Sequence, residues 1–403
     1  MLRSIRVGRV TPGRFAAVAV LAAVVWSTGA CSTAAPRPKP APSAVPASSA
    51  PPSPGDPALA GGPGRLVCFG PTPQEWAAGF ATHTVVPGGG LMFVSGALAG
   101  DTTYGQYHLP SRSGIGALDL ASGQLTKISS FRPGVSGLGG MAVEPPWLVW
   151  AQLNSETDLS DWSLHAWDQR TGATSVLATS RLADGTNVKG QEPLPVLRNG
   201  RVTWAQPVPA AAGTFEAELR TVDLATRQKT TLASGRISSP VYAGRYLIWG
   251  TVSGSNEYAF QAVDADTRQP VPLPAGLPHP DSIGYLAGSA DAFAWSSLDG
   301  TRLTVWQLGS AHHDEFAIHD GIHFFQFLQL AGHFLVWFAA GTSAVLDLTT
   351  GAGFDVSGGS VAGSPAWIVR ADPIGQPATK GALVPSRVSR IATGSAPPIT
   401  GCR

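Results

Sequence analysis

The chain has 403 residues, of which 43% are hydrophobic and 13% charged, and its formal net charge is +1. Without the four arginines of residues 1–14, 23 basic residues stand against 26 acidic ones, a net charge of −3. A near-neutral chain of this kind lacks the basic surface that nucleic-acid-binding proteins need, so we exclude that class.

Residues 1–30 have the composition of an export signal. Four arginines and no acidic residue precede an apolar run of 12 residues, 15–26. This run is shorter than the roughly 20 residues of a membrane-spanning helix, as expected for a signal peptide. The small residues that end at Cys31 resemble a bacterial lipoprotein signal, which implies a lipid on Cys31. Thr28 departs from that pattern, and simple secretion is the alternative.

Residues 31–64 form a Pro/Ala/Ser-rich segment that contains ten prolines between Pro36 and Pro63. A segment with so little apolar bulk does not bury enough surface to fold. Because prolines keep a chain extended at about 3.1 Å per residue, its reach is up to ~100 Å. We therefore predict a disordered tether between the membrane and a folded domain over residues 65–403.

The folded domain repeats a short strand-like phrase that closes on Trp. The clearest copies end at Trp150, Trp204, Trp249, Trp295 and Trp337, at intervals of 54, 45, 46 and 42 residues. A β-type repeat of this length is typical of β-propeller blades. We therefore predict an all-β propeller, with about seven four-stranded blades favoured over six or eight.

A second motif recurs where the third strand of each predicted blade ends. An Asp is followed three residues later by Thr or Ser, and then by Gly or Arg; the copies begin at Asp119, Asp168, Asp223, Asp264 and Asp347. In such turns the carboxylate accepts hydrogen bonds from backbone N–H groups two or three residues later. We therefore interpret these Asp residues as structural rather than catalytic.

These repeats resemble those of TolB-like and quinoprotein-like bacterial β-propellers over roughly residues 72–395. The resemblance implies the fold and leaves the activity open, because propellers host catalysis, binding and scaffolding alike. Quinoprotein repeats usually carry a Trp soon after the Thr-Gly turn, whereas Thr171-Gly172 is followed by Ala-Thr-Ser-Val. This departure argues against a quinone, and we expect no cofactor.

The chain has three cysteines, Cys31, Cys68 and Cys402. With Cys31 assigned to the lipid, the other two lie at the ends of the propeller, which meet when the ring closes. In an oxidising compartment we predict a disulfide between Cys68 and Cys402, worth about 5 kcal/mol on the chain-entropy model. Two unrelated free thiols are the alternative.

Ligands of propellers usually meet the face built by the loops between second and third strands and between blades. We expect the long loops 97–115 and 152–162 to form that face, because long loops with aromatic and carboxylate side chains often bind ligands. The candidates are Asp101, Tyr104, Tyr107 and His108 in the first loop, and Glu156, Asp158 and Trp162 in the second. Solvated loop tips without a function are the alternative.

Five of the nine histidines fall within residues 312–333, which suggests a metal site. The blade alignment places the first two on the opposite face from the next two, so at most three side chains share one ion: His319, Asp320 and His323. Calcium is disfavoured near residue 158, because Leu159 stands where an EF-hand loop requires Gly. We favour a protein without a bound metal.

The sequence contains no nucleophile elbow, phosphate loop, Cys-x-x-Cys pair or dinucleotide fingerprint. We therefore favour an envelope-anchored, extracytoplasmic and monomeric binding or scaffold protein for a protein or glycan partner. An extracellular hydrolase or lyase that uses carboxylates or histidines of the loop face is the alternative, and a metal-dependent sensor is the third hypothesis.

Overall fold

The computed structural model describes residues 64–132, 137–155, 157–190, 192–211, 214–254, 256–310, 312–318, 325–339, 342–375 and 384–400. In these ranges strands predominate, and no helix is long and apolar enough to cross a membrane. The predicted signal peptide, the tether and the lipid site Cys31 lie outside the described residues, so these assignments stay predictions.

Most strands follow one another in groups that each form an antiparallel sheet, numbered here as blades 1 to 7 among the described residues. Blade 1 consists of β3 (Leu91–Ala99), β4 (Thr102–Leu109), β5 (Arg112–Asp119) and β6 (Leu125–Ser130). Blade 2 consists of β7 (Gly137–Glu144), β8 (Trp147–Leu153), β9 (Trp162–Asp168) and β10 (Ala173–Thr179). Blade 3 consists of β11 (Val196–Arg198), β12 (Arg201–Val208), β13 (Glu216–Asp223) and β14 (Lys229–Gly235).

Blade 4 consists of β15 (Val241–Ala243), β16 (Tyr246–Val252) and β17 (Tyr258–Asp264), and blade 7 of β26 (Ser360–Gly363), β27 (Trp367–Pro373) and β28 (Ser386–Ala392). Blade 5 consists of β18 (Leu286–Gly288), β19 (Ala292–Ser296), β20 (Arg302–Gln307) and β21 (His313–Ile318). Blade 6 consists of β22 (Phe325–Ala331), β23 (Phe334–Ala339), β24 (Thr342–Asp347) and β25 (Ala352–Ser357). The total blade count of the chain stays a prediction from its repeat.

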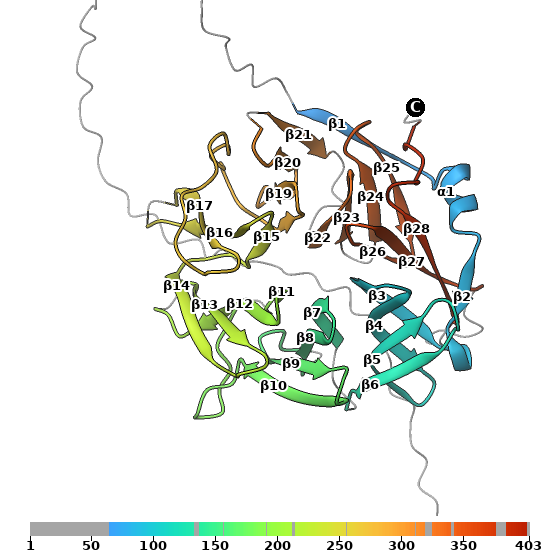
Figure 1. The fold of residues 1–403 in the computed structure, drawn as a ribbon, viewed down its shortest axis with the longest axis horizontal. Coiled ribbons are helices and arrows are strands. Elements are labelled where there is room, and N and C mark those ends of the chain that lie inside the picture. Colours follow the sequence, from blue (N-terminus) through green and yellow to red (C-terminus); the bar gives the residue numbers. More distant parts are fainter. Residues whose placement is uncertain are drawn as a thin grey trace, which may run out of the picture.

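Figure 1 shows the sheets arranged around a central axis, with the first strand of a blade nearest the axis and the last strand at the rim. Neighbouring inner strands contact one another from β3 to β7 and from β7 to β11, and again from β15 through β18 and β22 to β26. The inner strand β26 of the last blade also contacts β3 of the first blade, which closes the ring. This arrangement confirms the predicted β-propeller.

Two N-terminal strands fasten the ring. Strand β2 (His83–Val85) pairs antiparallel with β28 and is the outermost strand of blade 7. Strand β1 (Arg65–Gly70) runs parallel to β21 through its first half and parallel to β25 through its second half, so it joins blades 5 and 6. Cys68 of β1 is disulfide-bonded. Its predicted partner Cys402 lies outside the described residues, so that pairing stays a prediction.

Helix α1 (Gln74–Gly79) and the C-terminal segment both pack against blade 6. Trp76 of α1 is fully buried, meets the rings of Phe334 and Phe354 at 5.1 Å, and donates its indole N–H to the carbonyl of Pro397 at 2.9 Å. A second tie runs from Ile399, whose backbone N–H donates to Asp347 Oδ2 at 3.0 Å. The two ends of the propeller therefore meet on one blade.

Both repeated motifs have structural roles. The five repeated Trp residues lie in second strands and are at most 4% exposed, so their large rings fill the contacts between blades. Asp223 shows the turn chemistry, since its Oδ1 accepts the N–H groups of Ala225 at 3.0 Å and Thr226 at 2.9 Å. The other four Asp residues make equivalent backbone contacts, which confirms their structural interpretation: Asp119, Asp168, Asp264 and Asp347.

Candidate functional site

The connections of the propeller lie on two opposite faces, because successive strands of a blade are antiparallel. Turns from first to second strands and from third to fourth strands lie on one face. Connections from second to third strands and from one blade to the next lie on the other, which we call the loop face. This geometry decides which candidate side chains lie near one another.

The prediction of a loop at residues 97–115 is wrong, because most of these residues form strands β4 and β5, which are joined by a two-residue connection. Thr102 pairs with the turn residue Asp119, as Trp147 pairs with Asp168 in blade 2. Gly105 therefore occupies the position of the repeated Trp. Blade 1 lacks the phrase that marks the second strand in blades 2 to 6, and this absence concealed the strand in the sequence.

The first group of candidates is consequently dispersed. Asp101 lies in the turn between β3 and β4, on the face opposite the loop face, where it forms an ion pair with Arg390. Tyr104 and Tyr107 are 3% and 0% exposed core residues of β4, and burial raises the pKa of Tyr104. His108 alone lies near the loop-face end of β4, and burial lowers its pKa below the usual range.

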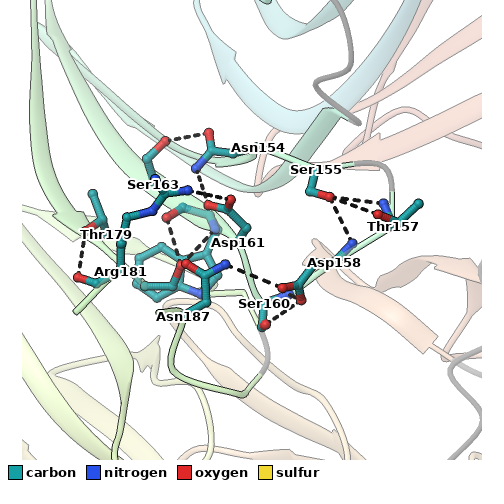
Figure 2. A network of polar contacts seen from close by, with 12 residues as sticks. Asn154, Ser155, Thr157, Asp158, Ser160, Asp161, Ser163, Thr179, Arg181 and Asn187 are labelled. Atoms are coloured by element: carbon teal, nitrogen blue, oxygen red, sulfur yellow. Dashed lines mark hydrogen bonds and ion pairs between the residues drawn. The ribbon is translucent and has the colours of Figure 1, made fainter. Parts of the chain in front are cut away.

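The second predicted loop is present as residues 154–161 between β8 and β9, and its polar side chains bond one another (Figure 2). Asp158 Oδ1 accepts the hydroxyl of Ser160 at 2.5 Å and its backbone N–H at 3.1 Å. From the connection to blade 3, Asn187 Nδ2 and Lys189 Nζ reach Asp158 Oδ2 at 3.4 and 3.3 Å. These contacts, the Ser160 hydroxyl foremost, lower the pKa of Asp158 to about 2.

A second set of contacts ties the base of this loop to β9 and the next connection (Figure 2). Asp161 accepts hydrogen bonds from Asn154 Nδ2 at 3.1 Å and from Arg181 Nη2 at 3.0 Å. Ser163 Oγ donates to Asn154 Oδ1 at 3.1 Å and lies 2.8 Å from Nε2 of His165. Burial lowers the pKa of His165, so this histidine is a neutral part of the network at pH 7.

The remaining candidates of the second group are Trp162 and Glu156. Trp162 is fully buried in the core of blades 2 and 3, so it is a packing residue. Glu156 lies outside the described residues, as do the metal candidates His319, Asp320 and His323. Within the described ranges, no group of three His, Cys, Asp or Glu side chains is placed to hold a metal ion.

The sequence did not reveal a cavity of about 150 Å³ near the axis, between blades 1, 2, 6 and 7. Its aromatic wall contains Phe93 of β3 together with Trp337 and Phe338 of β23, and its polar wall contains Gln106 and Gln329. Each of these side chains comes from a first or second strand. Closure of the ring brings them together from positions more than 200 residues apart.

The two glutamine side chains hold neighbouring blades around this cavity. Gln106 Oε1 accepts the backbone N–H of Leu138 in blade 2 at 2.9 Å. Gln329 Nε2 donates to the carbonyl of Ser95 in blade 1 at 3.2 Å, and its Oε1 accepts the N–H of Gly363 in blade 7 at 2.8 Å. Amides used in this way fix the shape of the cavity before any ligand binds.

A glutamate that is not among the residues lining the cavity packs against β7. Glu192 precedes β11, and its Cγ would lie 3.0 Å from a Cβ added to Gly139, which lines the cavity. Glu192 is partly exposed, but enough protein surrounds its carboxyl group to raise its pKa. Burial, and then the charge of Glu192, raise the pKa of Tyr285 to about 12, so these two side chains of different blades are neighbours.

The whole chain was also compared with known proteins. No protein-family model and no curated protein matches it. Among solved structures it is similar to a prolyl endopeptidase, with 12% identity, a TM-score of 0.49, and coverage of 81% of this chain but 50% of that one. The chain thus spans half the length of that enzyme.

Two further structures are similar to the chain at comparable levels. For oligogalacturonate lyase from Vibrio parahaemolyticus, the identity is 11%, the TM-score is 0.48, and the coverage is 76% of this chain and 91% of that one. For TolB from Acinetobacter baumannii, the values are 12%, 0.39, 65% and 62%. These likenesses concern the fold alone.

Proposed function

We propose that this protein is an extracytoplasmic binding or scaffold protein, anchored to the membrane by a lipid on Cys31, whose loop face engages a protein or glycan partner. The export signal, the Pro-rich tether and the absence of catalytic sequence motifs support this proposal. One structural observation carries it, namely the placement of exposed apolar side chains.

Large exposed apolar side chains are concentrated in the connections of the loop face. Of the eight among the described residues, four lie in these connections: Leu182, Phe215, Leu298 and Ile374. The other four lie on strands, and the described turns of the opposite face contain none. Because these four side chains lie on one face, that face offers apolar contacts to a partner, which favours the loop face and, of the two partner classes, a protein.

The loop network described above also suits binding. Lys189 and Arg181 bond carboxylates while remaining 80% and 58% exposed, so charged groups of this network stay accessible to a partner. Because Asn154, Asp158 and Asp161 are already held by hydrogen bonds within the protein, a partner meets side chains that lose little conformational freedom on binding. A polar rim around apolar tips is the usual composition of a protein interface.

The same network disfavours Asp158 and Asp161 as the carboxyl pair of a glycoside hydrolase. A glycoside hydrolase needs one carboxylic acid that is protonated near neutral pH and a second carboxylate that is free to act. Asp158, with a pKa of about 2, is ionised at pH 7, and Asp161 is held by Asn154 and Arg181. Neither carboxylate meets these requirements.

The test is capture of partners from the native cell envelope on immobilised full-length protein, with bound protein and bound glycan both identified by mass spectrometry. Two variants are matched in exposure, since Leu298 is 63% exposed on the loop face and Val176 is 58% exposed on the outer strand β10. We expect Leu298→Glu to lose the partner that the wild type and Val176→Glu both retain. Capture that Leu298→Glu leaves unchanged, or release of a cleaved glycan, would overturn the proposal.

A further inference from the structure

We propose that the axial cavity is a second binding site, which takes a small uncharged aromatic molecule. A cavity of about 150 Å³ accommodates a molecule the size of benzene. The expected ligand therefore has about six to eight non-hydrogen atoms. This inference does not depend on the partner proposed for the loop face.

The residues that line the cavity carry no charge. Among the described residues, the lining consists of Phe, Trp, Val, Leu, Gly, Ser and Gln, without any Asp, Glu, His, Lys or Arg. A charged group that entered this cavity would leave water without meeting an opposite charge, which is unfavourable. The lining therefore favours an uncharged ligand.

Three polar side chains of the lining are already bonded within the protein. Gln106 Oε1 accepts the N–H of Leu138 at 2.9 Å, and Ser360 Oγ accepts the N–H of Val94 at 3.0 Å. Gln329 is bonded at both ends of its amide. Because a buried water needs two to four polar partners, these bonded groups hold a water or a hydroxyl-rich ligand only weakly. An apolar ligand therefore displaces little that is firmly bound.

The accessible side chains of the lining are mainly apolar. Phe93 is 38% exposed, and Leu138, Phe327 and Phe338 are partly exposed, whereas Gln106 is buried. A ligand that covered these side chains would remove their apolar surface from water. An aromatic ligand would add ring–ring contacts with the three phenylalanines, which stabilise a complex beyond the burial of area.

Contacts within the protein hold these rings in place. Phe327 and Phe338 are direct cross-strand partners in β22 and β23. The ring of His108 meets the ring of Phe93 edge-on, with 5.6 Å between their centroids. Because the rings are positioned before a ligand arrives, they lose little conformational freedom when it binds.

The cavity lies near the loop-face end of the axis. Leu138, Phe338 and Ser360 are each among the first or last two residues of their strands β7, β23 and β26, at the ends that adjoin loop-face connections. A small molecule would therefore enter from the loop face.

The experiment titrates the full-length protein at pH 7.5 with three probes of similar shape, namely benzyl alcohol, benzylammonium and benzoate, and measures binding by calorimetry. We expect the wild type to bind benzyl alcohol at least about tenfold more tightly than either charged probe. A preference for a charged probe, or equal affinity for all three, would overturn the proposal. Failure to detect benzyl alcohol at concentrations up to about 10 mM would also overturn it.

Two truncations locate the bound probe. Phe93→Ala removes a ring from the cavity, whereas Leu66→Ala removes a 59% exposed apolar side chain from β1, which pairs with the outer strands of blades 5 and 6. We expect Phe93→Ala to weaken benzyl alcohol binding several-fold and Leu66→Ala to leave it unchanged. Phe93→Leu keeps an apolar side chain in case the Ala variant does not fold, and it should weaken binding about twofold. Wild-type affinity in both Phe93 variants would place the probe elsewhere and overturn the proposal.

Discussion

Replacing Trp76 with Ala tests how the ring is fastened. Trp76 is fully buried, contacts three aromatic rings, Phe80, Phe334 and Phe354, and bonds Pro397 in the C-terminal segment. Truncation of a buried Trp to Ala lowers the free energy of unfolding by about 3–5 kcal/mol. A domain of roughly 300 residues has an unfolding entropy of about 0.6 kcal/mol/K, so Tm should fall by about 5–8 °C.

Scanning calorimetry measures this shift, and Trp76→Phe is the matched control. The Phe side chain keeps an aromatic ring in the site and loses the N–H that bonds the Pro397 carbonyl, so its Tm should fall by only about 2–4 °C. A fall of less than about 2 °C for Trp76→Ala would refute the reasoning. It would mean that helix α1 and the C-terminal segment do not share in closing the ring.

Four further predictions concern stability. Asp347 is fully buried and accepts three hydrogen bonds, so Asp347→Ala should lower the unfolding free energy in urea by about 2–4 kcal/mol, against about 1 kcal/mol for the partly exposed Asp223→Ala. The pKa of Asp158 is lowered from 3.8 to about 2, so its stabilisation is complete above pH 3.8 and is lost as pH falls towards 2. Asp158→Asn should therefore flatten the acid limb of Tm against pH. The pKa of Glu192 is instead raised above 4.5, so the wild type should lose stability as pH rises past that value, and Glu192→Gln should not. If Cys68 pairs with Cys402, Cys68→Ser should lower Tm without a reductant by about the same amount as dithiothreitol lowers it in the wild type; a smaller effect of the substitution would contradict the pairing.

The sequence predicted the blades wherever the repeat is intact. The Trp phrase and the Asp turn mark second and third strands because both fill fixed structural positions. Blade 1 has Gly105 in place of the Trp, and the loop assignment failed there for that reason. The pairing of β1 and β2 was also beyond prediction, since these strands lie outside the repeat and pair with partners far along the chain.

The two candidate sites differ in the same way. The loop around Asp158 was predictable, because its residues are contiguous and lie between two recognisable strands. The axial cavity was not, because Phe93, Leu138 and Trp337 come from three blades and have no local motif in common. Their proximity follows from ring closure, which a repeat indicates in general but does not specify residue by residue.

The central claim, that the loop face is a binding surface, is tested most directly by photo-crosslinking in intact cells. A photoreactive amino acid is placed at position 298 of the loop face or at position 176 of the outer strand, where the native side chains are 63% and 58% exposed. We predict one dominant crosslinked envelope partner from position 298 and none from position 176. The same products from both positions, or no product from position 298, would contradict the claim.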